Sequence, residues 1–364
     1  SFPAHLPRDS HRIHHHHHLL LLLLPSAGRR ENIVRRNASS LSVGEFVDRF
    51  ESKNRPLVIS GAMEGWEAFR KWDVEFLRQR YGEKRFSVGG YKMRLESYLR
   101  YMVMAEDDQT LYLFDKEFAK VDPELGAAYQ IPPYFSAERD LFSSLKEKRP
   151  DFRWLIMGPK RSGSTFHKDP NGTSAWNACV RGRKKWILLP PGRPPVGVLA
   201  SQDGVDVTAP VSLVEWFINY YHQLPEMGVE VIECVQNPGD IVFVPSGWWH
   251  CVLNLKDSIA ITQNYVSTSN LQRTLKALRL PELVSGIPKH RRANFREEFV
   301  QSLKENHPEI YQRFLPHGTS VSAEGQGAVG KTRNGDGDAM DCGITGGGNS
   351  AERNNNDDDD DDDD

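Results

Sequence analysis

The stretch FHKDPNGTSAWNACVRGRKKWILLPP, from Phe166 to Pro191, decides how the rest of this chain is interpreted. Near its start, His167 and Asp169 are separated by one residue, so an extended backbone places both side chains on the same face. Pro170 disfavours a helical conformation at Asp169 and keeps that residue extended. The pair therefore predicts two converging metal ligands, although a His-x-Asp triplet alone also suits an ordinary surface loop.

The sequence around this stretch has the pattern of a β-protein. Between residues 150 and 267, short apolar runs are separated by Gly and Pro, and these runs are FRWLIM, SAWNACV, KKWILLP, VEVIECV, DIVFVP, HCVLNL and SIAITQNYV. Many short strands with regular turn signals predict an all-β barrel or a double-sheet jelly roll. Helical patterns lie before and after this region, so we expect a mostly β fold with flanking helices.

The third ligand of a metal site has to come from another strand. His250 follows PGDIVFVPSGWW and opens the run HCVLNL, which we expect to pair with IVFV in a hairpin. Two histidines and one carboxylate with open positions describe the facial triad of non-haem Fe(II) oxygenases, and zinc would take the same ligands. A hydrogen-bonded structural histidine is the plain alternative for His250.

An iron site of this kind needs an electron-donating co-substrate, and a dicarboxylate would need a buried cation. We expect a hairpin around Gly182-Arg183, beyond which Lys184 and Lys185 point to opposite faces of a strand. One lysine can then anchor a carboxylate as a compact point charge, although a lysine pair on a strand edge is more often solvated. Asn177 and Thr262 lie on faces with small residues, which suits a ligand-filled interior.

Taken together, these segments resemble a known family. The blocks PLV, LYLFD, RWLIMGP, the opening stretch, GDIVFVPSGWWHCVLNL and SIAITQNYVS are similar to those of JmjC-domain dioxygenases of the cupin superfamily. The resemblance runs from about residue 41 to residue 315, and it is greatest to the bifunctional arginine demethylase and lysyl-hydroxylase (phosphatidylserine receptor-like) branch. It implies a double-stranded β-helix, the cupin-like JmjC barrel, that uses Fe(II), 2-oxoglutarate and O₂.

The resemblance also implies roles for individual residues. It implies three iron ligands, namely His167, Asp169 and His250. It implies five residues around 2-oxoglutarate, namely Lys184, Thr262, Tyr112, Asn177 and Ser164. Lys184 would bind the distal carboxylate, and Ser164 keeps the hydroxyl of a threonine that the close branch carries. Lys168 replaces an aliphatic residue of that branch, and we expect it to face away from the metal.

The implied activity is that of a protein oxygenase which hydroxylates lysyl side chains, demethylates methyl-arginine, or does both. Its substrates would carry Lys/Arg-rich segments, as histones and splicing-type proteins do, which suits a chromatin regulator in the nucleus or cytoplasm. Two other functions stay open. The basic stretch KHRRANFR (289–296) permits RNA contact by an RNA-modifying hydroxylase, and the fold could serve as a non-catalytic binding module.

Composition agrees with a globular protein. The 364 residues are 38% hydrophobic and 26% charged, and no apolar run approaches the ~20 residues that cross a membrane. The four cysteines form no CxxC pair, so that a cysteine zinc site is disfavoured and reduced thiols of an intracellular protein are expected. The folded region is mildly basic, because the acidic charge is concentrated in a terminal run of aspartates.

Five regions are expected along the chain. Residues 1–30 contain runs of His and Leu and should be disordered, with a signal peptide as the alternative. Residues 31–149 form a helical and mixed support region, residues 150–267 the double-stranded β-helix, and residues 268–317 the C-terminal helices. Residues 318–364 form a disordered acidic tail. The chain begins at Ser1 rather than Met, which leaves open an upstream module such as an F-box.

An apolar stripe marks the first C-terminal helix. Leu271, Leu275 and Leu278 recur at helical spacing. We expect this stripe to pack against the β-region, with a homodimer contact through the C-terminal helices as the alternative.

Overall fold

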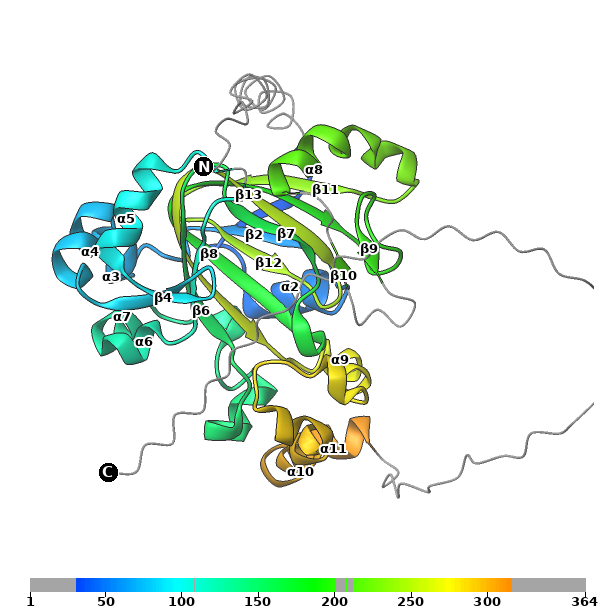
Figure 1. Ribbon diagram of the computed structural model, residues 1–364. Coiled ribbons are helices and arrows are strands. Elements are labelled where there is room, and N and C mark those ends of the chain that lie inside the picture. Colours follow the sequence, from blue (N-terminus) through cyan, green and yellow to red (C-terminus); the bar gives the residue numbers. More distant parts are fainter. Residues whose placement is uncertain (1–30, 108, 201–206, 209–211, 316–364) are drawn as a thin grey trace, which may run out of the picture. The chain divides into compact units, whose positions relative to one another are not determined.

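The computed structural model describes residues 31–107, 109–200, 207–208 and 212–315, which Figure 1 draws in colour. The disordered regions predicted for residues 1–30 and 318–364 lie outside the described residues. Among the described residues, no helix has both the length and the apolar character needed to cross a membrane.

The first third of the chain alternates short helices and strands. Its elements are β1 (Val34–Asn37), α2 (Val43–Phe46), η1 (Val47–Glu51), β2 (Leu57–Ser60), α3 (Glu67–Lys71), α4 (Val74–Tyr81), β3 (Arg85–Val88), β4 (Tyr91–Arg94), α5 (Leu95–Met104), β5 (Leu113–Asp115), α6 (Phe118–Val121), α7 (Pro123–Ala127), η2 (Pro133–Phe135) and η3 (Leu141–Lys148). Local chemistry sets their ends: the Asp73 side chain accepts a hydrogen bond from the Phe76 backbone N–H and thereby caps α4.

The middle of the chain is mostly β, and the last part is helical. The middle elements are β6 (Arg153–Gly158), β7 (Gly163–His167), η4 (Pro170–Gly172), β8 (Ser174–Leu189), β9 (Leu199–Ala200), β10 (Val207–Thr208), α8 (Leu213–Asn219), η5 (Tyr221–Met227), β11 (Ile232–Gln236), β12 (Ile241–Val244) and β13 (Trp249–Tyr265). The last elements are α9 (Leu271–Ala277), η6 (Pro281–Leu283), η7 (Lys289–Asn294), α10 (Phe295–Asn306) and α11 (Pro308–Phe314).

Eleven strands form one mostly antiparallel sheet. Its order is β1-β2-β12-β8-β13-β6-β5-β3-β4, with β11 added to β8 and β7 added to β13. The two longest strands, β8 and β13, pair along their whole length, from Trp249 opposite Leu189 to Tyr265 opposite Ser174. The predicted mostly β fold with flanking helices is confirmed. In the described part of the chain, however, the sheet order has two ends, so that the sheet is not a closed barrel.

Two predicted hairpins are wrong. No turn divides the chain at Gly182-Arg183, because β8 continues through both residues, and the irregular register of β13 between Asn254 and Ala260 accommodates the bend. The run IVFV does not pair with HCVLNL either, since β12 lies between β2 and β8. The runs HCVLNL and SIAITQNYV, which the sequence pattern separates, are two parts of the single strand β13.

The main core lies between the sheet and the N-terminal helices. Ile259 and Ile261 of β13 pack there with Trp176 of β8 and with apolar residues of α2, α4 and α5. Figure 1 shows α3, α4 and α5 together on one side of the sheet. Alternation along a strand sends every second side chain to the opposite face. On β8 and β13, the side chains between those of the main core therefore point to the other face of the sheet.

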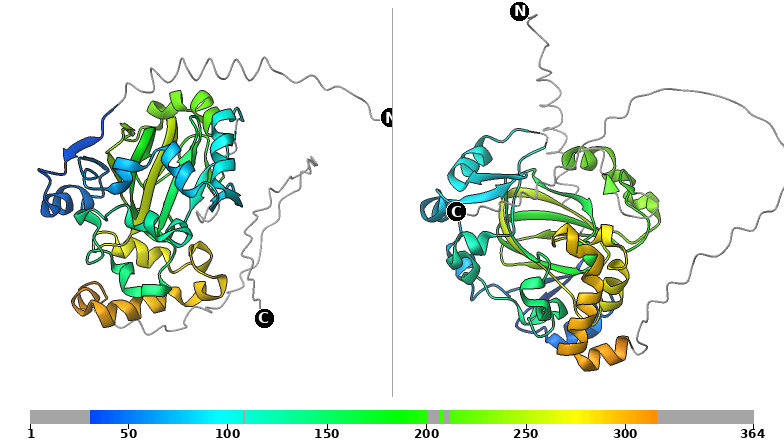
Figure 2. Two further views of the ribbon diagram at one scale, coloured as in Figure 1. Left: turned by 90° about the vertical axis from the view of Figure 1, so that its left-hand side faces the viewer. Right: turned by 60° about the horizontal axis from the view of Figure 1, so that its bottom comes forward.

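The leucine stripe packs inside the chain. Leu271, Leu275 and Leu278 are buried in a second core with residues of η3 and α10. Figure 2 shows α9 to α11, in yellow and orange, together at one end of the sheet. The stripe is thus covered by the chain's own helices, and a homodimer contact through the C-terminal helices stays a prediction.

Candidate metal centre

Two adjacent strands bring His167 and His250 together. His167 ends β7, His250 lies near the start of β13, and the two residues are directly opposite each other in the antiparallel register. Residues so paired project side by side from the same face of a sheet. Their ring centroids are 4.2 Å apart. The strand pairing therefore places the two imidazoles next to each other.

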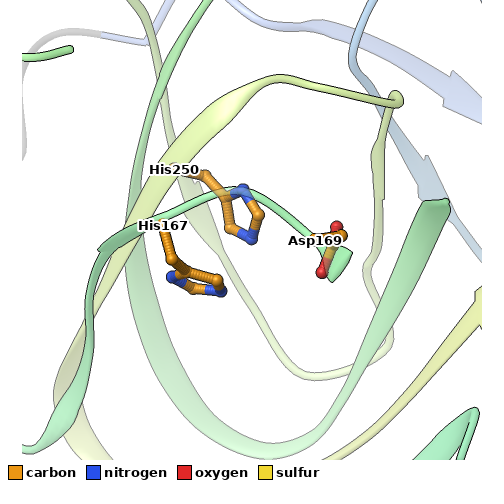
Figure 3. A group of neighbouring side chains, drawn as sticks. All are labelled: His167, Asp169 and His250. Atoms are coloured by element: carbon orange, nitrogen blue, oxygen red, sulfur yellow. The ribbon is translucent and has the colours of Figure 1, made fainter. Parts of the chain in front are cut away.

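Asp169 completes the group from the loop that follows β7. Its backbone is extended (φ −60°, ψ 141°), as the proline after it requires, and the 3-10 helix η4 begins at Pro170. One ligand atom from each of His167, Asp169 and His250 can be chosen so that all three lie within 4.8 Å of one another. Figure 3 shows the two rings beside each other with the Asp169 carboxylate facing them.

Backbone carbonyls orient both imidazoles. His167 Nδ1 lies 2.7 Å from the Thr165 carbonyl oxygen, and His250 Nδ1 lies 3.1 Å from the Trp248 carbonyl oxygen. A carbonyl oxygen can only accept, so each Nδ1 carries a proton, and each Nε2 is the nitrogen left to bind a metal. This is the arrangement that metal-binding histidines adopt, with the second nitrogen fixed by a backbone acceptor.

The electrostatics of the group favour a bound cation. Asp169 Oδ2 is buried and has no hydrogen-bond partner among the described residues. Burial raises the pKa of the Asp169 carboxyl to about 6, against the opposing effects of His167 and Asn264. Burial, and secondarily the charge of His167, hold the pKa of His250 well below its usual value. The lowered pKa keeps the His250 imidazole neutral, and this imidazole together with the orphaned oxygen of Asp169 fits a divalent metal ion.

Lys184 and Lys185 point to opposite faces, as alternation along β8 predicts. Lys185 Nζ forms an ion pair of 2.7 Å with Glu233 on the face away from the histidines. Lys184 is 1% exposed, and its Nζ donates to Asn254 Oδ1 at 2.8 Å and to the Tyr112 hydroxyl at 3.4 Å. No carboxylate in the described ranges lies within 4 Å of the Lys184 ammonium, which therefore has only uncharged partners.

One cavity of about 380 Å³ unites the predicted residues. All eight line it, namely Tyr112, Ser164, His167, Asp169, Asn177, Lys184, His250 and Thr262. Asn177 Oδ1 is buried there without a hydrogen-bond partner in the described part of the chain, whereas Thr262 Oγ1 donates to the Trp176 carbonyl at 2.9 Å. Lys168 faces away, with its Nζ 4.6 Å from the centre of the Trp249 ring.

Other residues of the cavity were not predicted. They include Phe114, Asp151, Trp154 and Trp186. Phe114 follows Tyr112 by two residues, and this spacing could have placed it on the same face. Asn254, which contacts Lys184, shares its face with His250 by the same alternation. Asp151 has no such signal, because it precedes β6 in a segment without periodicity.

The basic stretch at 289–296 contributes no residue to the cavity lining. Two of its arginines form ion pairs within the chain, Arg291 with Glu298 at 2.6 Å and Arg296 with Glu297 at 3.5 Å. RNA contact through this stretch stays a prediction.

Comparison with known proteins identifies relatives over most of the described region. Residues 43–270 match the family of the cupin-like domain. "Arginine-specific demethylase JMJ22" of Arabidopsis thaliana is 46% identical over 287 residues, which cover 78% of this chain and 56% of that protein. "Bifunctional arginine demethylase and lysyl-hydroxylase psr-1" of Caenorhabditis elegans is 38% identical over 298 residues, covering 78% of this chain and 71% of that protein.

A third relative has a name that states its cofactors. "2-oxoglutarate and iron-dependent oxygenase JMJD4" of Mus musculus is 31% identical over 268 residues, covering 64% of this chain and 60% of that protein. The chain thus spans little more than half the length of JMJ22 and most of the length of psr-1.

Proposed function

Since the chain belongs to the cupin-like JmjC family, we propose that it is an Fe(II)- and 2-oxoglutarate-dependent protein oxygenase acting on lysyl or methyl-arginyl side chains. One observation carries the proposal. The His167–Asp169–His250 group and a buried lysine that lacks a carboxylate partner in the described part of the chain line the same cavity. The zinc alternative is disfavoured because the JMJD4 relative is named for its dependence on iron.

The chain's own residues divide into two binding sets. The Nε2 atoms of His167 and His250 and the carboxylate of Asp169 would hold the iron. Lys184, with the hydroxyl groups of Tyr112 and Thr262, would bind the distal carboxylate of 2-oxoglutarate. Asn177 and Ser164 line the same cavity. Iron, once bound with 2-oxoglutarate and O₂, would supply the oxidising power to break a substrate C–H bond.

Lys184 supports a dianionic co-substrate on electrostatic grounds. A buried ammonium without an acid partner costs free energy, because its water shell is only partly replaced by two uncharged acceptors. An incoming carboxylate would complete the pair. The lysine thus selects a co-substrate with a carboxylate at the end remote from the metal.

The overall reaction would consume one O₂. One oxygen atom enters succinate as 2-oxoglutarate loses CO₂, and the other enters the substrate C–H bond. A lysyl side chain would become hydroxylysine. An N-methyl group on arginine would become a carbinolamine, which loses formaldehyde and leaves arginine with one methyl group fewer.

The substrates would be proteins with Lys/Arg-rich segments, such as histones or splicing-type proteins. The named activities of JMJ22 and psr-1 support arginine and lysine side chains as targets. A nuclear or cytoplasmic location is supported by Cys179, Cys234 and Cys251, which are buried and form no disulfide in the described residues.

Succinate formation tests the proposal. The protein is incubated with Fe(II), 2-oxoglutarate and a histone-tail peptide that carries lysine and methyl-arginine, and His167→Ala is the comparison. We expect succinate with wild type only. Mass spectrometry of the peptide should show the gain of one oxygen or the loss of one methylene. Equal succinate formation by both proteins would exclude the proposal.

A further inference from the structure

An aromatic and acidic rim borders the cavity on the side of β5 and β6. Phe114 of β5 lies opposite Ile156 of β6, and its ring stacks on Trp154 with centroids 5.3 Å apart and an interplanar angle of 23°. Phe114 remains 45% exposed although it lines the cavity. Asp151, three residues before Trp154, lines the same cavity.

Asp151 gives this rim its charge. Among the described residues that line the cavity, it is the one carboxylate besides Asp169, so the metal group does not use it. Its Oδ2 lies 3.0 Å from Lys116 Nζ, and the two side chains are 36% and 52% exposed. An ion pair this exposed contributes little to stability because water screens it, so another cation can replace Lys116 at small cost.

The backbone fixes Asp151 against a neighbouring loop. Its N–H donates to the Gly286 carbonyl at 2.8 Å. Gly286 has φ +78°, and a Cβ at that position would lie 2.9 Å from the Asp151 nitrogen. Only glycine allows the two segments to approach this closely without strain. The main chain of Asp151 is therefore held at the rim.

We propose that Asp151 and the Phe114–Trp154 stack, which line the same cavity, form a recognition subsite for a cationic side chain of the peptide substrate, from which that side chain displaces Lys116. This inference rests on the proposed function and adds the residues that select its substrate. A guanidinium can lie on an exposed aromatic face while it bonds a carboxylate. The rim combines both features, whereas a neutral side chain would leave the Asp151–Lys116 pair intact.

Peptide affinity tests the subsite without turnover. The probe is a fluorescent Gly/Ser peptide with two arginines, and its matched control carries citrulline, which keeps the shape and removes the charge. Binding is measured without O₂, with Fe(II) and 2-oxoglutarate present. We expect Asp151→Asn to weaken binding of the arginine peptide by about tenfold, which is the usual scale for a hydrogen bond between charged groups. Lys116→Gln should tighten binding of the arginine peptide by up to about fivefold, because the competing cation is gone.

Two controls separate local recognition from overall charge. Glu83 and Arg94 form an exposed ion pair of 3.1 Å outside the cavity lining, and Glu83→Gln and Arg94→Gln change net charge by the same amounts. These variants should leave the affinity unchanged. Phe114→Leu removes the exposed ring and keeps the Asp151 carboxylate. It should weaken binding of the arginine peptide by about threefold.

The inference fails if Asp151→Asn binds the arginine peptide as tightly as wild type does. It also fails if Asp151→Asn and Glu83→Gln lose the same affinity for that peptide. It also fails if the citrulline peptide binds wild type as tightly as the arginine peptide. Failure of the proposed function is a different result, since wild type would then form no succinate with any peptide.

Discussion

Adjacent lysines in β8 have opposite surroundings, and this contrast is the most informative feature at the scale of single residues. Lys185 is neutralised by Glu233, whereas Lys184 has two uncharged partners. Their opposite directions could be predicted, because alternation in a strand depends on sequence order alone. Which of them faces the histidines could not be predicted without the register between β8 and β13.

Replacing each lysine by methionine should therefore give opposite results. Lys184→Met removes a buried charge that lacks an acid partner, so folding stability should hold or rise while 2-oxoglutarate binding weakens by tenfold or more. Lys185→Met leaves the buried Glu233 carboxylate without its cationic partner and should lower the free energy of unfolding by about 3 kcal/mol. Urea unfolding and 2-oxoglutarate titration of both variants measure these effects. The same loss of stability in both variants would contradict the assignment of an acid partner to Lys185 and of only uncharged partners to Lys184.

At the scale of elements, the bend in β8 shows where sequence patterns fail. Gly-Arg between two apolar runs signals a turn, but the same signal also marks a bend in a continuous strand. Gly182 has φ +87°, and a Cβ there would lie 2.2 Å from the Asp257 carbonyl oxygen of β13. Pairing with β13 therefore decides between turn and bend, and that pairing joins residues far apart in sequence.

Gly182→Ala should destabilise the protein by more than about 2 kcal/mol, since it combines a left-handed backbone with a clash against the neighbouring strand. Gly65→Ala is the matched control, because its added Cβ would meet no atom within 4 Å. It should change the unfolding free energy by less than about 0.5 kcal/mol. Equal urea midpoints for the two variants would show that the bend does not require glycine.

At the scale of the whole molecule, a buried acid joins segments from three parts of the chain. Glu51 at the end of η1 accepts from Arg139 at 2.7 Å, from the Tyr265 hydroxyl at 2.8 Å and from the Ser269 hydroxyl at 3.0 Å. These contacts tie the N-terminal helices to the end of β13. Helices around a β-region could be predicted from the sequence. The contacts of Glu51 could not, because no sequence pattern indicates which residues a single Glu in an amphipathic segment will contact.

Glu51→Ala should lower the free energy of unfolding by about 3 kcal/mol, because it leaves the Tyr265 hydroxyl and the Arg139 guanidinium without their acceptor. Glu83→Ala, which removes an exposed acid, should cost less than about 1 kcal/mol. Chemical unfolding at neutral pH compares the two. A smaller loss for Glu51→Ala than for Glu83→Ala would mean that the network does not stabilise the fold.

The central claim is that His167, Asp169 and His250 form one iron site that 2-oxoglutarate completes. The most direct measurement uses the full chain with His14–His18 replaced by asparagine, so that no histidine run competes for metal. Fe(II) and then 2-oxoglutarate are added without O₂, and the visible charge-transfer absorption of the chelated iron is recorded. We predict one iron per chain and an absorption band that both disappear in folded His250→Ala. Iron binding and an absorption band that persist unchanged in His250→Ala would contradict the claim.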